Sequence, residues 1–215
     1  RGARLEVALS TADGFEEPTV WFTEPEWDLY SATVTPGDID GDGTDELVVR
    51  STADLPKGEK APKTTRLSLL RAGGSGFSTA GEPYDLREDI ALSAPVDAGD
   101  VDGDGDAEVV AYVPGQSSAR VLVMEVEDEQ IQSGTTWLKR DSRGYTDLPN
   151  DRFLTDADGD GKADLVLLPS PEKRSFTVAV ALSGDQMFEE PEQWTEIDCR
   201  NDPCDESWMI LRSGS

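Results

Sequence analysis

Three short stretches of the sequence concentrate carboxylates at a fixed spacing. They are residues 38–47 (DIDGDGTDEL), 100–109 (DVDGDGDAEV) and 156–165 (DADGDGKADL), and in each an acidic residue stands at positions 1, 3, 5 and 9. A hard dication such as Ca²⁺ takes about six to eight oxygen ligands. Alternating aspartates in a tight turn can direct several carboxylates to one centre. The spacing therefore predicts three calcium-binding loops, called loop 1 (38–46), loop 2 (100–108) and loop 3 (156–164).

The predicted ligands are the four acidic side chains of each loop and the backbone carbonyl at position 7. A carbonyl ligand needs no particular side chain, which explains the unlike residues found at position 7. The glycine at position 6 permits the sharp bend that returns the chain. The candidates are Asp38, Asp40, Asp42, Thr44 and Glu46 in loop 1, Asp100, Asp102, Asp104, Asp106 and Glu108 in loop 2, and Asp156, Asp158, Asp160, Lys162 and Asp164 in loop 3.

The loops do not follow the EF-hand pattern. An EF-hand needs Glu at position 12 and helices on both sides, whereas position 12 here is Val49, Ala111 or Leu167. A short apolar run typical of a buried strand follows each loop. The alternative is an Asp/Gly-rich surface turn that binds nothing. The recurrence of four acidic positions in three copies favours the metal site.

The composition is that of a folded and strongly acidic chain. Its 215 residues include 45 acidic and 19 basic side chains, for a formal net charge of −26, and no histidine. This charge argues against nucleic acid and anionic membrane surfaces as partners. The absence of His removes the commonest general base and the Ser-His-Asp triad. No apolar run has the length of a membrane span, and no signal peptide is present, although a leader or more protein could precede Arg1.

Alternating and apolar segments predict an all-β chain without a helical period. The loops start at residues 38, 100 and 156, which are 62 and 56 residues apart. A unit of four strands and one loop, repeated at this interval, is typical of β-propeller blades. The predicted strands are 4–10, 19–23, 30–35, 46–50, 65–71, 95–98, 108–113, 119–126, 135–139, 152–155, 165–168, 175–182, 192–196 and 207–212.

A second repeat accompanies the acidic loops. Residues 13–18 (DGFEEP) match residues 185–191 (DQMFEEP), and residues 74–77 (GSGF) are a looser copy. Phe15 and Phe77 each precede the first aspartate of the next loop by 23 residues (15 to 38, 77 to 100). We predict that these phenylalanines and Phe188 pack between neighbouring blades.

The Phe-Gly-like turns and the Asp-x-Asp-Gly-Asp-Gly-x-x-Asp/Glu-Leu loops together resemble the FG-GAP/VCBS repeat family. Integrin α-chain propellers and many secreted bacterial proteins belong to that family, and the resemblance covers nearly the whole chain. It implies four-stranded blades with Ca²⁺ in the hairpin between the first two strands. It also implies ligand binding on the opposite face, here at residues 51–63, 114–118 and 169–174. Glu46 and Glu108 depart from the usual Asp at position 9, so those sites could coordinate slightly differently.

The chain is too short for the seven blades common in that family. Head and tail strands either share one mixed blade and close a four-bladed ring, or belong to a piece of a larger propeller. Cys199 and Cys204 are expected to form a disulfide in an exported protein, with free thiols in the cytosol as the alternative. We expect one propeller domain, 1–215, made of a partial blade (1–30), three blades (31–91, 92–146, 147–197) and a stapled turn with a closing strand (198–215).

These features favour a secreted or cell-surface binding or scaffold module for a protein or glycan partner, with structural calcium and no catalytic residue. Its ligand-binding residues are not identified. Exposed tryptophans could stack on sugar, although packing is their more ordinary role. One alternative is a calcium-dependent hydrolase or lyase, whose catalytic carboxyl would have a raised pKa away from the loops. Another is a structural repeat assembled through its terminal strands. The tryptophans are Trp21, Trp27, Trp137, Trp194 and Trp208.

Overall fold

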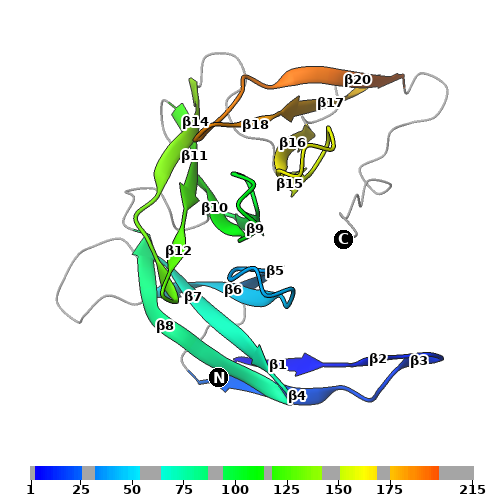
Figure 1. Ribbon diagram of the computed structural model, residues 1–215, viewed down its shortest axis with the longest axis vertical. Coiled ribbons are helices and arrows are strands. Elements are labelled where there is room, and N and C mark those ends of the chain that lie inside the picture. The colour runs from blue at the N-terminus through cyan, green and yellow to red at the C-terminus, as the bar shows by residue number, and fades with distance from the viewer. Residues whose placement is uncertain are drawn as a thin grey trace. The chain divides into compact units, whose positions relative to one another are not determined.

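The computed structural model describes residues 3–25, 32–53, 64–86, 94–113, 118–141, 151–168 and 175–198. Every regular element in these ranges is a β-strand, and every strand pair is antiparallel (Figure 1). The prediction of an all-β chain is therefore confirmed. Within the described ranges, no helix is long and apolar enough to cross a membrane.

Three sheets contain four strands each, and the strands lie side by side in chain order. In all three, an acidic loop joins the first strand to the second. The first sheet contains β5 (Thr33–Gly37), β6 (Glu46–Ala53), β7 (Thr64–Gly73) and β8 (Gly76–Leu86). The second contains β9 (Val96–Gly99), β10 (Glu108–Val113), β11 (Ser118–Met124) and β14 (Thr135–Asp141). The third contains β15 (Asp151–Thr155), β16 (Asp164–Leu168), β17 (Ser175–Ala181) and β20 (Glu192–Asp198).

A short ribbon extends the hairpin between the third and fourth strands. In the second sheet it pairs β12 (Val126–Glu127) with β13 (Gln130–Ile131), and in the third it pairs β18 (Ser183–Gly184) with β19 (Met187–Phe188). In the first sheet β7 and β8 themselves continue to the tip, where Gly73 pairs with Gly76. Strands of two residues are too short to produce an alternating pattern, so the sequence did not reveal these ribbons as separate strand pairs.

The N-terminal segment contains the outer half of this pattern. β1 (Ala3–Val7) pairs with β4 (Thr19–Glu24), and the ribbon of β2 (Ser10–Thr11) and β3 (Gly14–Phe15) connects them. These strands are the counterparts of the third and fourth strands of a four-stranded sheet.

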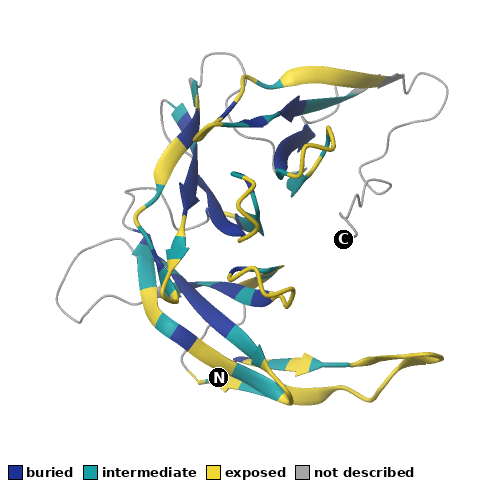
Figure 2. Ribbon diagram, viewed as in Figure 1, coloured by how far each residue is buried: buried dark blue, intermediate teal, exposed yellow. Residues whose placement is uncertain are grey.

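The chain divides into two compact units. Unit 1 comprises residues 1–93 and 126–132, and unit 2 comprises residues 94–125 and 133–215. In unit 2, the second and third sheets share one apolar core that includes Val110, Val121, Trp137, Leu165 and Phe188. Every residue of β10 and β16 is buried, whereas most described residues of β20 are exposed (Figure 2). The apolar runs after loops 2 and 3 are therefore core strands, as predicted.

The repeated phenylalanines behave differently in the two units. In unit 2, Phe188 is 1% exposed, and its ring centroid lies 5.5 Å from that of Trp137 on β14. In unit 1, the Phe77 ring lies 5.4 Å from the Trp21 ring on β4. Phe15 is 77% exposed. The predicted packing is present at Phe77 and Phe188 but wrong for Phe15 within the described residues, because none of them covers its ribbon.

Three tryptophans occupy the same place, the third residue of an outer strand. Trp21 and Trp137 pack against phenylalanine, whereas Trp194 is 48% exposed on β20. Residues 51–53 extend β6, so the predicted loop at 51–63 begins later than expected. Several predictions lie outside the described residues: Cys199, Cys204, Trp27, Trp208, the closing strand at 207–212, and the candidate ligand loops at 54–63, 114–117 and 169–174.

Candidate metal centres

Each acidic loop is a hairpin turn whose backbone bends at its second glycine. The φ angles at position 6 are positive: 86° at Gly43, 102° at Gly105 and 92° at Gly161. Glycine adopts this conformation without the steric cost that a Cβ would add. The bend predicted from the sequence is therefore present in all three loops.

In loops 2 and 3, backbone N–H groups hold the loop carboxylates in one repeated pattern. Both carboxylate oxygens of Asp100 accept hydrogen bonds, from the N–H of Gly103 at 2.6 Å and of Gly105 at 3.0 Å. Asp102 accepts from the Asp104 N–H, and Asp104 accepts from the Asp106 N–H. Loop 3 repeats all four bonds at the same positions. The aspartates are thus fixed to the turn by its own backbone.

The acid at position 9 closes each loop from the start of the second strand. Its carboxylate accepts the N–H of position 2: Glu46 from Ile39 at 3.1 Å, Glu108 from Val101 at 2.8 Å, and Asp164 from Ala157 at 2.9 Å. Glu46, Glu108 and Asp164 are only 4%, 1% and 1% exposed.

Burial raises the pKa of all three position 9 carboxyls, that of Glu108 to about 8. Neighbouring loop aspartates raise these pKa values further, while the N–H donors oppose the shift. Burial favours the neutral form of such a carboxyl, and a positive charge beside it favours the ionised form. The loops therefore supply an environment that favours a bound cation.

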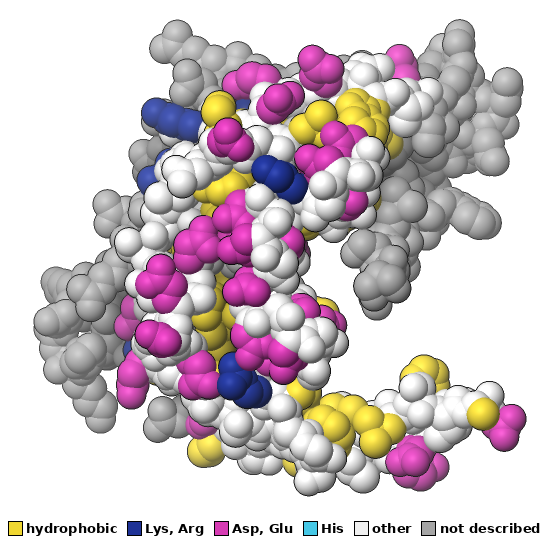
Figure 3. All heavy atoms as spheres, in the orientation of Figure 1, with side chains coloured by type: hydrophobic (Ala, Val, Ile, Leu, Met, Phe, Trp, Pro, Cys, Tyr) yellow, Lys and Arg dark blue, Asp and Glu magenta, His cyan; other side chains and the backbone are white. Residues whose placement is uncertain are grey.

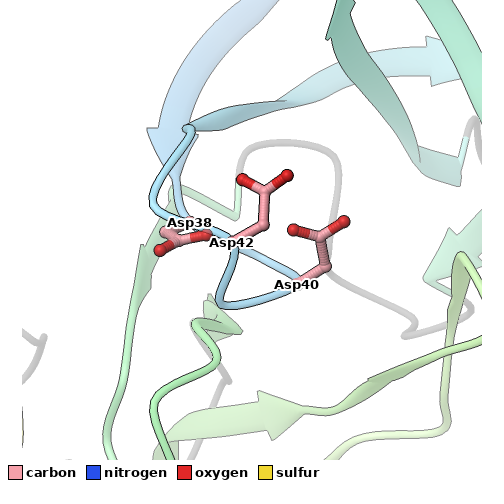
Figure 4. A group of neighbouring side chains, drawn as sticks. All are labelled: Asp38, Asp40 and Asp42. Atoms are coloured by element: carbon pink, nitrogen blue, oxygen red, sulfur yellow. The ribbon is translucent and has the colours of Figure 1, made fainter.

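The carboxylates gather into one group of three in each loop. Within each group, the candidate ligand oxygens lie within 4.8 Å of one another. Figure 4 shows the loop 1 group, whose side chains project from a single turn. Asp104, Asp160 and Glu46 stand outside these groups, and the carbonyl role of Thr44, Asp106 and Lys162 stays a prediction. The groups are Asp38, Asp40 and Asp42; Asp100, Asp102 and Glu108; and Asp156, Asp158 and Asp164.

These residues fit a hard divalent cation. The grouped side chains offer carboxylate oxygens, which Ca²⁺ prefers. In loop 1, Asp38 Oδ1 is buried without a hydrogen-bond partner. Like charges this close repel one another, and a cation placed among them relieves that repulsion. Acidic side chains also outnumber basic ones among the described residues on the face shown in Figure 3.

A basic residue that the sequence pattern does not reveal reaches loop 1. Arg71 on β7 places its Nη2 2.6 Å from Asp40 Oδ2 and its Nε 3.8 Å from Glu46 Oε1. Its Nη1 lies 3.0 Å from Glu129 Oε1 in the β12–β13 turn. The signal that could have found Arg71 is the strand pairing, in which Leu70 lies opposite Leu47 and so brings Arg71 beside the loop.

Loops 2 and 3 are in direct contact within unit 2. The Ala163 N–H at position 8 of loop 3 donates to the Asp100 carbonyl at 2.6 Å. The Lys162 methylenes lie so close to Gly103 that a Cβ there would meet them at 3.2 Å. The backbone of one candidate ligand, Asp100, is therefore held by the neighbouring loop.

One perturbed carboxyl lies outside the acidic loops. Burial raises the pKa of Asp97 on β9, while the Tyr112 hydroxyl and Arg152 favour its ionised form. The Arg152 guanidinium carbon lies 4.1 Å from the centre of the Tyr112 ring, a cation–π distance. The sequence analysis did not single out Asp97. Its contacts are those of a packed polar group between the second and third sheets.

The chain matches no protein-family model, and comparison with curated proteins finds no significant match.

Proposed function

We propose that this chain is a calcium-stabilised β-propeller, or a piece of one, that serves as an exported binding or scaffold module. Loops 1, 2 and 3 each hold one structural Ca²⁺. The observation that carries the proposal is the convergence of three carboxylates in the same hairpin of three successive four-stranded sheets.

Calcium in these loops would act on stability more than on chemistry. The N–H groups of the loop backbone hold the acidic side chains in place around the turn. We expect their carboxylate oxygens to bind the ion rather than to take part in a reaction. A cation that binds only the native state stabilises it by about 2.7 kcal/mol per site at a hundred times its dissociation constant. The ion would also neutralise the buried carboxyls of Glu46, Glu108 and Asp164.

The propeller arrangement is supported by a contact that recurs within each unit. The ribbon phenylalanine of one sheet packs on the outer-strand tryptophan of another, as Phe77 does on Trp21 and Phe188 does on Trp137. Phe15 is also a ribbon phenylalanine and Trp194 is also an outer-strand tryptophan, but both are exposed. A propeller requires a further sheet against each of them, supplied by the tail strands of this chain, by additional sequence or by a second copy.

The partner of such a module is a protein or a glycan. The net charge of −26 disfavours nucleic acid and anionic lipid surfaces. An exported setting suits both millimolar calcium and the proposed Cys199–Cys204 disulfide. The loops that the family resemblance assigns to ligand binding lie mostly outside the described residues, and the proposed partner is therefore a chemical class, protein or glycan.

Thermal unfolding of the full chain in EGTA and in millimolar Ca²⁺ tests the proposal. We expect Ca²⁺ to raise the melting temperature by at least several degrees, because three sites each stabilise the native state. Asp102→Asn should lose part of this rise, and Asp185→Asn, which removes an exposed acid from the β18–β19 turn, should keep it. Equal melting curves in EGTA and Ca²⁺ would show that the loops are surface turns. The mass in solution, measured in parallel, separates a monomeric module from an assembled structural repeat.

A further inference from the structure

Arg71 makes loop 1 different from loop 2, although the two sequences are closely matched. Both loops contain five acidic residues, and both have Glu at position 9. In loop 1 the guanidinium of Arg71 contacts the carboxylates of positions 3 and 9, Asp40 and Glu46. A positive charge supplied by the protein therefore already stands among the predicted ligands of that loop.

The strand pairing shows what replaces Arg71 in the other sheets. Leu70 lies opposite Leu47, Met124 opposite Val109 and Ala181 opposite Leu165. The residue that follows is Arg71 in the first sheet, Glu125 in the second and Leu182 in the third. The position that follows this pair therefore holds a basic residue in the first sheet, an acidic residue in the second and an apolar residue in the third.

The hydrogen-bond pattern of loop 1 differs from that of loops 2 and 3 at the aspartate that Arg71 contacts. In loops 2 and 3, the position 3 aspartate accepts the N–H of position 5, at 3.1 Å in both. In loop 1 the corresponding Asp40 bonds to the Arg71 guanidinium at 2.6 Å instead. The position 1 aspartate of loop 1, Asp38, accepts one backbone N–H bond where Asp100 accepts two, and its Oδ1 has no hydrogen-bond partner.

The group of three carboxylates in loop 1 also differs from the groups in loops 2 and 3. In loops 2 and 3 the carboxylate group contains the position 9 acid, whereas in loop 1 it contains Asp42 and leaves Glu46 out. The Glu46 carboxylate instead lies 3.8 Å from the Arg71 Nε and accepts a hydrogen bond from the Ile39 N–H. A divalent cation entering loop 1 would have to displace the guanidinium or bind beside it, against the repulsion between like charges.

We propose that Arg71 is an internal counter-ion that competes with Ca²⁺ for loop 1. Loop 2, which has Glu125 at the corresponding place, binds Ca²⁺ more tightly, and loop 1 fills at higher concentration. The inference rests on the proposed calcium function and adds a graded response to it. At low Ca²⁺ loop 1 is held by Arg71, and at high Ca²⁺ the guanidinium is released toward Glu129 and solvent.

Calorimetric titration of the full chain with Ca²⁺ at low ionic strength tests this inference. Asp38→Asn and Asp100→Asn change the same position in loops 1 and 2, which belongs to the carboxylate group of both loops, and they assign the binding events. We expect Asp100→Asn to remove a tight event and Asp38→Asn to remove a weak one. Arg71→Gln should strengthen binding at loop 1 about tenfold, within the usual range for two coupled ligands. Arg66→Gln is the matched control, because Arg66 lies on the same strand and pairs with Asp85.

The reciprocal variant Glu125→Arg keeps the inference testable if Arg71→Gln weakens folding, and it should lower the affinity of loop 2. Equal affinities at loops 1 and 2, unchanged by Arg71→Gln and Glu125→Arg, would overturn the role of Arg71 and leave the calcium function standing. No Ca²⁺ binding in the wild type or in any variant would overturn the calcium function, and this inference with it.

Discussion

The two units use the same repeat but complete it to different degrees. In unit 2, Phe188 is buried against Trp137, and loops 2 and 3 hold their aspartates with a full set of backbone bonds. In unit 1, the Phe15 ribbon is exposed, and loop 1 replaces a backbone bond with the Arg71 guanidinium. One sequence motif can therefore be completed by its own backbone, by a neighbouring sheet or by a side chain from another strand.

The largest expected difference lies in the apolar contacts. Phe188→Ala should destabilise unit 2 by about 3–5 kcal/mol, because it leaves a cavity beside Trp137. Phe15→Ala should change stability by less than about 0.5 kcal/mol if its ribbon is exposed in solution. Urea unfolding in Ca²⁺ measures both. A Phe15→Ala cost as large as that of Phe188→Ala would show that another sheet covers Phe15, as a completed propeller requires.

The next difference concerns the aspartate at position 1. In saturating Ca²⁺, Asp100→Ala should cost about 2 kcal/mol more than Asp38→Ala, because Asp100 accepts two backbone N–H bonds and Asp38 accepts one. Urea unfolding midpoints of the two variants check this. Equal costs would mean that the two loops are equally ordered once calcium is bound.

The pH dependence of the calcium-free protein should also separate the loops. The pKa of Glu108 is raised to about 8, so in EGTA the folded state binds a proton that the unfolded state loses above its ordinary pKa. Stability in EGTA should therefore fall as pH rises between about 5 and 8, because the folded state binds more protons there.

Glu108→Gln should remove more of this slope than Glu46→Gln, because Arg71 lowers the pKa of Glu46 and so opposes its shift. Thermal unfolding at a series of pH values measures both slopes. Identical slopes in the two variants would count against the difference between the loops.

The smallest expected effect is the coupling between loops 2 and 3. Asp164→Asn should lower the Ca²⁺ affinity of loop 2 a few-fold, because the adjacent Ala163 N–H holds the Asp100 carbonyl. Asp185→Asn removes a charge from the β18–β19 turn, outside loop 3, and serves as the control. Calorimetry that finds loop 2 unchanged in Asp164→Asn would show that the two sites fill independently.

The sequence by itself determined most of the strands and the three acidic turns. Alternation, glycine spacing and the apolar runs after each loop are local features, so they are visible without a fold. They predicted β6, β10 and β16 closely. They did not reveal β8, which pairs with β7, or the two-residue ribbon strands, whose pairing depends on the hairpins around them.

Tertiary structure decided what lies beside each loop. Arg71 is 25 residues from Glu46 in sequence (46 to 71), and only the pairing of β6 with β7 brings them together. The exposure of Phe15 and the burial of Phe188 likewise depend on whether a neighbouring sheet is present, although the two sequence segments are nearly identical. Charge and packing act through space, so equal motifs acquire unequal properties when the chain places different residues against them.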